Sequence, residues 1–179
     1  MILGRLAGAR RVLEIGTLGG YSTAWLAEAL MPGGCVLTIE IDPVRAEAAR
    51  ETFRQAGISD RVEVRCGTGE AELCRLIEAK AEPFDLVFVD ADKESSAAYF
   101  DLALGLTRVG GLIVIDNVIR EGNILDAAHA DPRARGSRAA IERVGASRGT
   151  FASVLQTVGS KGHDGFAIAL VGEASARRG

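Results

Sequence analysis

The feature that most constrains the fold is a repeated alternation of apolar, β-branched segments with amphipathic ones. The apolar segments indicate buried strands at Arg11–Ile15, Cys35–Glu40, Val62–Cys66, Phe84–Val89 and Leu112–Ile115. Apolar residues recur at helical spacing between them, at Tyr21–Leu30, Pro43–Ala56, Glu70–Ala79 and Ser96–Thr107. Parallel strands need such crossover connections. The pattern therefore predicts an α/β fold with a doubly wound sheet that binds ligands at the carboxyl ends of its strands.

The remaining segments complete one domain over residues 1–179. We expect a loop at Asn117–Asp131, a helix near Pro132–Ala146 and a final hairpin of two strands, Thr150–Thr157 and Gly165–Val171. The net charge of −3 argues against a generic nucleic-acid coat and favours a small-molecule substrate. The apolar runs are far shorter than a membrane span, so we expect a cytoplasmic protein without a membrane partner.

The first strand runs into a glycine turn that suits a nucleotide cofactor. Gly16, Gly19 and Gly20 allow a sharp turn and a close backbone approach. Their spacing lacks the G-x-G-x-x-G fingerprint of dinucleotide sites, which argues against a pyrophosphate. Glu14 before the turn can pair with an ammonium group, and Glu40 at the end of the second strand can bind the hydroxyls of a ribose. S-adenosylmethionine carries an ammonium group and a ribose but no phosphate, so it is the predicted cofactor.

The third strand ends in Gly67-Thr68-Gly69, where small residues and the free amides of a helix N-terminus can hold an adenine edge. This motif is weak when taken alone. Its position beside the predicted ribose site is what favours a role in binding the cofactor.

Oxygen ligands follow the next two strands. Asp90 ends the fourth strand, and Asp116 and Asn117 end the fifth. Neighbouring strands lie about 4.8 Å apart, so these side chains can reach one ion. Carboxylate and amide oxygens favour a hard cation such as Mg²⁺. Lys93 follows Asp90 closely, and a nearby cation together with partial desolvation would lower its pKa towards that of a general base.

With these residues identified, the chain resembles the cation-dependent O-methyltransferases that act on adjacent hydroxyls, the group of the caffeoyl-CoA and catechol enzymes and their bacterial relatives. The match runs from about Leu6 to Val171. The motifs occur in family order: Glu14-Ile15-Gly16-Thr17-x-x-Gly20-Tyr21-Ser22, Ile39-Glu40, Asp90-Ala91-Asp92-Lys93, Asp116-Asn117 and Gly159-Ser160-Lys161-Gly162-x-Asp164-Gly165.

The resemblance implies a seven-stranded, Rossmann-like methyltransferase sheet with an antiparallel last strand, in a homodimer whose chains are usually longer at the N-terminus. It implies a role in binding S-adenosylmethionine for Glu14, Gly16, Thr17, Ser22, Glu40 and Gly69, with Asp92 touching the cofactor or the substrate. Asp90, Asp116 and Asn117 would hold the metal, and Lys93 would be the base. The substrate would be a small phenol with two vicinal hydroxyls, since chelation of both would orient and activate the attacking oxygen.

Three alternative hypotheses about the function remain open. The fold of a nicotinamide-dependent oxidoreductase would begin with the same strand, glycine turn and helix, but it would need the G-x-G-x-x-G fingerprint that this chain lacks. Some relatives methylate a hydroxylated tRNA uridine, and this chain has a basic stretch at Arg133, Arg135, Arg138, Arg143 and Arg148, although no aromatic residues are interleaved with it. A non-catalytic cofactor-binding protein would be indifferent to the loss of Lys93.

Overall fold

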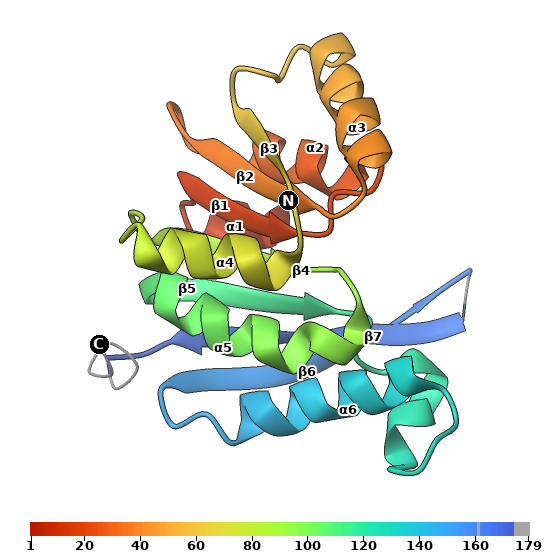
Figure 1. The fold of residues 1–179 in the computed structure, drawn as a ribbon. Coiled ribbons are helices and arrows are strands. Elements are labelled where there is room, and N and C mark those ends of the chain that lie inside the picture. Colours follow the sequence, from red (N-terminus) through yellow and green to blue (C-terminus); the bar gives the residue numbers. More distant parts are fainter. Residues whose placement is uncertain (161, 174–179) are drawn as a thin grey trace.

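The computed structural model describes residues 1–160 and 162–173 and contains one seven-stranded sheet between two layers of helices (Figure 1). The strands are β1 (Arg11–Ile15), β2 (Cys35–Glu40), β3 (Val62–Cys66), β4 (Phe84–Val89), β5 (Thr107–Asp116), β6 (Thr150–Gly159) and β7 (Gly162–Val171). Their order in the sheet is β3-β2-β1-β4-β5-β7-β6. Only β7 runs antiparallel, to β5 and to β6. The doubly wound sheet with an antiparallel last strand is therefore confirmed.

Helices follow most of the strands. They are α1 (Ile2–Leu6), α2 (Tyr21–Ala29), α3 (Pro43–Gln55), α4 (Gly69–Glu78), α5 (Ser96–Leu106) and α6 (Pro132–Gly145), with 3₁₀ turns η1 (Lys93–Ser95) and η2 (Arg120–Leu125). Asp42 and Asp131 cap α3 and α6 by accepting backbone N–H groups of the first turn, and a proline follows each cap. No helix in the described residues is long and apolar enough to cross a membrane.

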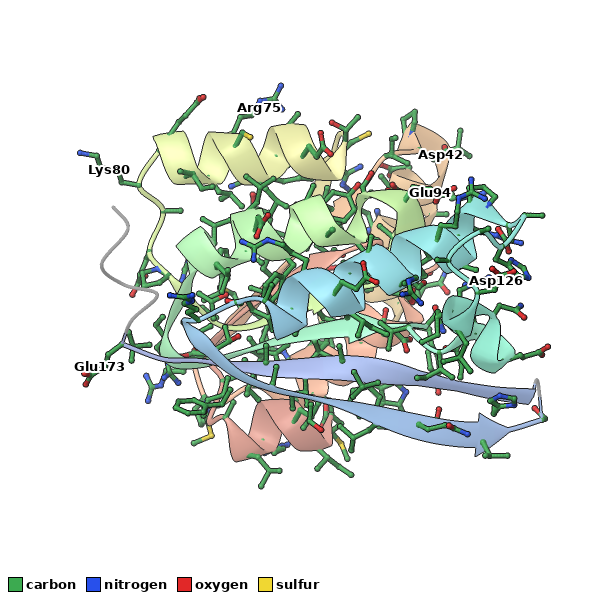
Figure 2. The ribbon with its side chains drawn as sticks, turned by 90° about the horizontal axis from the view of Figure 1, so that it is seen from below. Asp42, Arg75, Lys80, Glu94, Asp126 and Glu173 are labelled. Atoms are coloured by element: carbon green, nitrogen blue, oxygen red, sulfur yellow. The ribbon has the colours of Figure 1, made fainter. Side chains whose placement is uncertain are left out.

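The two faces of the sheet carry separate hydrophobic clusters because successive side chains of a strand point to opposite faces. Leu13 and Ile15 of β1 pack with residues of α4, α5 and α6 on one face. Val12 packs with residues of α1, α2 and α3 on the other. In Figure 2 the β6–β7 hairpin (blue) runs beneath α6 (cyan) along the margin of the molecule. The central strands are thus covered on both faces, which explains their continuous apolar sequences.

Most element boundaries lie within a residue of the predictions, but larger differences occur, including a 3₁₀ turn, η2, inside the predicted loop. The short helix α1 was not predicted. Strand β5 begins at Thr107 rather than Leu112. The strand continues through the pair Gly110-Gly111 because Gly110 adopts the left-handed region (φ 75°) and the register against β4 shifts there. The final hairpin is longer than predicted, since Val158 and Gly159 still pair with His163 and Gly162.

Asp85 ties the starts of three strands together. Its carboxylate accepts hydrogen bonds from the backbone amides of Arg10 and Arg11 (2.8 and 2.9 Å) and from the Arg108 side chain. Burial works to raise the pKa of Asp85, but these hydrogen bonds outweigh it and lower the pKa below the usual 3.8. A lowered pKa means that the ionised group stabilises the fold above pH 3.8 and that this stabilisation is lost as the pH falls through the lowered value.

We therefore expect Asp85→Ala to lower the free energy of unfolding at pH 7 by about 2 to 3 kcal/mol, since the amides and Arg108 lose a charged acceptor. Urea unfolding at pH 7 and at pH 3 measures this, and the difference from the unmodified chain should shrink at the lower pH. Asp60→Ala, at an exposed position, is the control and should have little effect. An equal loss at both pH values would contradict the role assigned to the charge.

Candidate active site

The carboxyl ends of β1, β2, β3, β4 and β5 lie at one edge of the sheet and border a cavity of about 1250 Å³. Tyr21 and Trp25 of α2 contribute aromatic rings to its wall. The predicted site residues that line it are Gly16, Thr17, Ser22, Glu40, Gly67, Gly69, Asp90, Asp92 and Asp116. Glu14, Lys93 and Asn117 are not among the lining residues. The sequence thus identified most of the polar wall of the cavity.

Gly16 makes the turn between β1 and α2 possible. Its φ is +103°, and a Cβ atom built on it would lie 2.1 Å from the carbonyl oxygen of Asp90. The two strand ends are also joined by a hydrogen bond from the Asp90 amide to the carbonyl of Ile15 (2.9 Å). The glycine turn and the start of the predicted metal site therefore touch through backbone atoms, and no larger residue fits at position 16 without moving one of them.

Glu14 lies beneath this turn and is fully buried. Its Oε2 accepts hydrogen bonds from the hydroxyls of Thr23 and Thr38, the latter at 2.6 Å, and the Thr17 hydroxyl lies 2.6 Å from that of Thr38. Burial raises the pKa of Glu14, while hydrogen bonds from the neighbouring hydroxyls act in the opposite direction. The other oxygen, Oε1, is buried, and no group in the described part of the chain donates to it with hydrogen-bond geometry. A buried acceptor without a donor is costly, so this atom suits a donor supplied by a ligand.

Glu40 closes the next strand and shapes the adjoining loop. Its two carboxylate oxygens accept the backbone amides of Leu18 (2.8 Å) and Asp42 (3.1 Å). An ionised carboxylate has about four acceptor positions, so these bonds leave acceptor capacity on both oxygens. Glu40 lines the cavity and is 4% exposed. It can therefore accept from a pair of ligand hydroxyls.

The glycines after β3 are packed closely against neighbouring side chains. A Cβ atom at Gly69 would lie 2.7 Å from the ring of Tyr99, and one at Gly67 would lie 2.7 Å from a carboxylate oxygen of Glu72. The Tyr99 hydroxyl donates to Asp92 Oδ1 at 2.7 Å. Burial works to raise the pKa of Asp92, but hydrogen bonds, including that from Tyr99, lower it overall. A larger residue at either glycine would therefore have to displace Tyr99 or Glu72.

Tyr99 and Thr38 are site residues that the sequence analysis missed. Thr38 is a polar residue inside the otherwise apolar strand Cys35–Glu40, which signals a buried polar partner. Tyr99 stands in the first turns of the helix that follows Asp92, so its proximity to Asp92 could have been noticed. Its packing against Gly69 could not, because that contact joins residues that are distant in sequence.

Asp90, Lys93 and Asp116 form a compact charged group. Lys93 Nζ donates to Asp90 Oδ1 at 2.7 Å, and Lys93 is 8% exposed. Burial raises the pKa of Asp116, and the charge of Asp90 raises it further, while Lys93 opposes the shift. Gly136 allows α6 to pack directly against the Lys93 backbone, because a Cβ atom there would lie 2.4 Å from the Lys93 carbonyl oxygen. Two carboxylates with one ammonium group leave an excess of negative charge.

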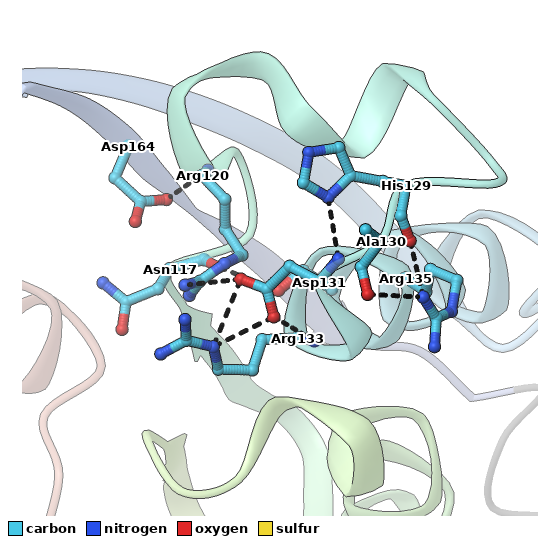
Figure 3. A network of polar contacts seen from close by, with 9 residues as sticks. Asn117, Arg120, His129, Ala130, Asp131, Arg133, Arg135 and Asp164 are labelled. Carbon is cyan, nitrogen blue, oxygen red and sulfur yellow. Dashed lines mark hydrogen bonds and ion pairs between the residues drawn. The ribbon is translucent and has the colours of Figure 1, made fainter.

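Asn117 follows Asp116 in the left-handed conformation, with φ of 55°. Its backbone N–H donates to Asp116 Oδ1 (2.8 Å), and its backbone carbonyl accepts from the buried hydroxyl of Ser137 (3.0 Å). No hydrogen bond among residues 1–160 and 162–173 uses its side-chain amide, which stands clear of the neighbouring ionic contacts in Figure 3. The side chain is thus available to a ligand, and the donor set of two carboxylates and an amide oxygen fits a hard cation.

The raised pKa of Asp116 leads to a stability prediction. A carboxyl group whose pKa is raised by folding costs stability when it is ionised, so the cost is present above its usual pKa of 3.8. We expect Asp116→Asn to raise the Tm of the metal-free protein at pH 7 by about 2 to 4 °C, the shift produced by about 1 kcal/mol in a chain of this size. Calorimetry at pH 7 in a chelator tests this. Asp126→Asn, in an exposed loop, is the control, and a lower Tm for Asp116→Asn would refute the prediction.

The basic stretch of α6 makes contacts mostly within the molecule. Arg135 and Arg138 donate to backbone carbonyls of the preceding loop. Arg133 pairs with Asp131, and Arg143 with Asp101. These arginines hold the loop and the neighbouring helix, which weakens their interpretation as a surface for nucleic acid.

One part of the family pattern lies outside the described residues. Lys161 of the hairpin motif is not described. The glycines on either side of it, Gly159 and Gly162, pair with each other at the end of β6 and β7.

Comparisons with known proteins agree with this geometry. A family model described as O-methyltransferase matches residues 1–146. The catechol O-methyltransferase of Mycobacterium tuberculosis is 52% identical over 169 residues, which cover 93% of this chain and 75% of the relative. The catechol O-methyltransferase of Niastella koreensis is 44% identical over 170 residues, covering 95% and 77%.

Solved structures give the same result. The crystal structure of an O-methyltransferase from Bacillus cereus in complex with SAH superposes with a TM-score of 0.92 at 49% identity, covering 95% of this chain and 77% of that one. An O-methyltransferase from Streptomyces achromogenes involved in tomaymycin synthesis, in complex with SAM, gives 0.91 at 44% identity, covering 96% and 77%. The chain belongs to the O-methyltransferase family, and it is an S-adenosylmethionine-dependent methyltransferase.

Proposed function

We propose that this methyltransferase moves the methyl group of S-adenosylmethionine to one hydroxyl of a catechol-type phenol, with a divalent cation, Mg²⁺, as its second cofactor. The observation that carries the proposal is the Asp90, Lys93 and Asp116 group, which stands at the end of two adjacent strands beside the glycine turn. Relatives named catechol O-methyltransferase support the choice of acceptor.

The proposed cofactor is divided among residues that line the cavity and the buried Glu14 beside it. The orphaned Glu14 Oε1 would accept from its ammonium group, directly or through water. Glu40 would bind the ribose hydroxyls through its remaining acceptor positions. The other residues proposed to bind the cofactor are Gly16, Thr17, Ser22, Gly67, Gly69 and Asp92, all of which line the cavity.

The proposed metal ligands are Asp90, Asp116 and Asn117. A bound cation would relieve the mutual repulsion of the two carboxylates, and the side-chain amide of Asn117, which makes no hydrogen bond among the described residues, would complete a set of oxygen donors. A divalent cation bound there would act as a Lewis acid towards the two substrate hydroxyls, which otherwise titrate near pH 10.

Lys93 is the proposed base. Its Nζ atom would take the proton of one hydroxyl, the freed oxygen would attack the methyl carbon, and the carbon–sulfur bond would break with its electron pair going to sulfur. The products are a monomethyl ether and S-adenosylhomocysteine. The hydrogen bond to Asp90 and the packing of Gly136 against its backbone hold the Nζ atom in place. Orientation by such fixed groups contributes much of the acceleration in this kind of transfer.

A cytoplasmic location and a homodimer remain predictions. Methylation of a tRNA hydroxyuridine is the weaker alternative, because Arg133, Arg135, Arg138 and Arg143 of the basic stretch make contacts within the molecule. The nicotinamide-dependent alternative is set aside by the family assignment.

The test measures S-adenosylhomocysteine release with a panel of catechol acids, flavonoids and hydroxyuridine tRNA, in Mg²⁺ and then in chelator. We expect turnover on a vicinal diol that is lost in chelator and restored by Mg²⁺. The corresponding monohydroxy phenols are matched controls and should not react. Equal turnover in chelator, or turnover on tRNA alone, would refute the proposed chemistry.

A further inference from the structure

The backbone of the loop after Asp116 adopts strained φ angles, so contacts from outside the loop must stabilise it. Asn117, Arg120 and Glu121 all have positive φ angles, of 55°, 49° and 57°. Residues other than glycine enter this region only at a cost in conformational energy, and a run of such residues persists only where surrounding contacts fix it. The proposed ligand Asn117 is the first residue of this loop.

Strand β7 makes the contacts that stabilise the loop. It continues past the end of β5, whose last residue pairs with Phe166. The carbonyl of Gly165 accepts a hydrogen bond from the backbone amide of Val118 (3.0 Å). Asp164 then accepts two successive loop amides on one oxygen, Oδ1: those of Ile119 at 3.0 Å and Arg120 at 2.9 Å. Figure 3 shows the contact with Arg120. The same oxygen accepts the amide of Gly165 at 2.9 Å.

Gly165 makes this approach possible. A Cβ atom at that position would lie 2.3 Å from the carbonyl oxygen of Leu155 and 2.7 Å from the side chain of Ile119. The loop therefore lies directly against the β6–β7 hairpin. On its other side, Ser137 of α6 bonds the carbonyl of Asn117. Asn117 is thus fixed between α6 and the Asp164 contact.

We propose that Asp164 is a positioning residue that presents Asn117 to the divalent cation by fastening the backbone two and three residues beyond it. This rests on the proposed metal site. Asp164 itself needs no contact with the metal or the substrate. Residues that orient metal ligands in this way typically affect metal affinity by about 10- to 100-fold.

A competing explanation is that Asp164 acts through its charge, since that charge contributes to the negative potential at Asp116. Two substitutions separate the explanations. Asp164→Asn keeps an acceptor oxygen at the same reach but removes the charge. Asp164→Glu keeps the charge but moves the oxygens outward by one methylene. The positioning role predicts that the asparagine variant behaves as the unmodified chain and that the glutamate variant does not.

The experiment uses Mn²⁺ alone as the probe, with its dissociation constant measured by electron paramagnetic resonance. We expect Asp164→Asn to bind within about threefold of the unmodified chain, and Asp164→Glu and Asp164→Ala to bind at least about tenfold more weakly. Affinity for S-adenosylhomocysteine should stay within about twofold in all three. Asp126→Ala is the matched control, because Asp126 accepts a backbone amide of the same loop, that of Ala128, at its exposed end.

Hydrogen exchange without metal gives a second readout. The amides of Ile119 and Arg120 should exchange faster in Asp164→Ala and Asp164→Glu but not in Asp164→Asn. Unchanged exchange in the alanine and glutamate variants would overturn this inference alone. So would weakened Mn²⁺ binding in Asp164→Asn together with unchanged binding in Asp164→Glu. Failure of the unmodified chain to bind Mn²⁺ would overturn the proposed metal chemistry and the inference with it.

Discussion

Replacing Lys93 by methionine is expected to reduce kcat for methyl transfer by about 10²- to 10⁴-fold, the range found for loss of a general base. The affinity for S-adenosylmethionine should change little, because Lys93 is not among the residues proposed to bind the cofactor and its Nζ atom bonds Asp90. Methionine matches the apolar stem of lysine, so the packing around this nearly buried side chain is kept. Initial rates at saturating cofactor and Mg²⁺, with isothermal titration of the cofactor, measure both effects.

Lys93→Arg is the control that separates a base from a structural partner. Arginine keeps the positive charge and can pair with Asp90, but it cannot lose its proton in a protein. We expect this variant to retain the Tm of the unmodified chain and still to lose most of its kcat. Retention of more than about a tenth of kcat by either variant would exclude Lys93 as the main base.

Gly16→Ala is expected to lower the free energy of unfolding by about 3 to 5 kcal/mol, the range of severe core disruptions. The substitution combines two costs: a φ of +103° that side chains rarely adopt, and a Cβ atom 2.1 Å from the Asp90 carbonyl oxygen. Relief of the clash must move the end of β4 or the turn itself. Any folded fraction should therefore bind both S-adenosylmethionine and Mn²⁺ more weakly.

Gly19→Ala is the matched control in the same turn. Nothing lies within 4 Å of a Cβ atom built at Gly19, and its φ lies outside the left-handed region. This substitution should leave the free energy of unfolding unchanged or raise it by up to about 1 kcal/mol, because alanine in an unstrained position restricts the unfolded chain more than glycine does. Urea unfolding and ligand titration on both variants decide the matter. A Gly16→Ala protein with unchanged stability and unchanged affinities would show that the turn tolerates a side chain.

Much of the sheet could be predicted from the sequence because its central strands are buried on both faces. Their continuous apolar sequences and the helical periodicity between them define both the elements and the fold class. The start of β5 could not be predicted, since Gly110 and a register shift interrupt the apolar pattern without ending the pairing. The short helix α1 gave no periodic signal because it has only five residues.

The site could be predicted as far as it follows the strand ends. Glu40, Asp90 and Asp116 each stand at or next to the end of a strand, so topology alone brings them to one edge. The burial of Glu14 beneath the turn could not be foreseen, because it depends on the threonines of α2 and β2 that face it. The role we give to Asp164 depends likewise on β7 reaching past β5, which is a property of strand length and register.

The packing of Gly136 against Lys93 also bears on how much sequence change the chain can tolerate around its proposed base. Lys93 lies against α6, whereas Asp126 and Ala128 bond to each other in the exposed loop. Arg138 and Arg135 of α6 bond backbone carbonyls on either side of these two residues, at Ile124 and Ala130, so the attachment of the loop to α6 does not use the side chains of Asp126 or Ala128. Substitutions at these two positions can therefore accumulate without displacing the base.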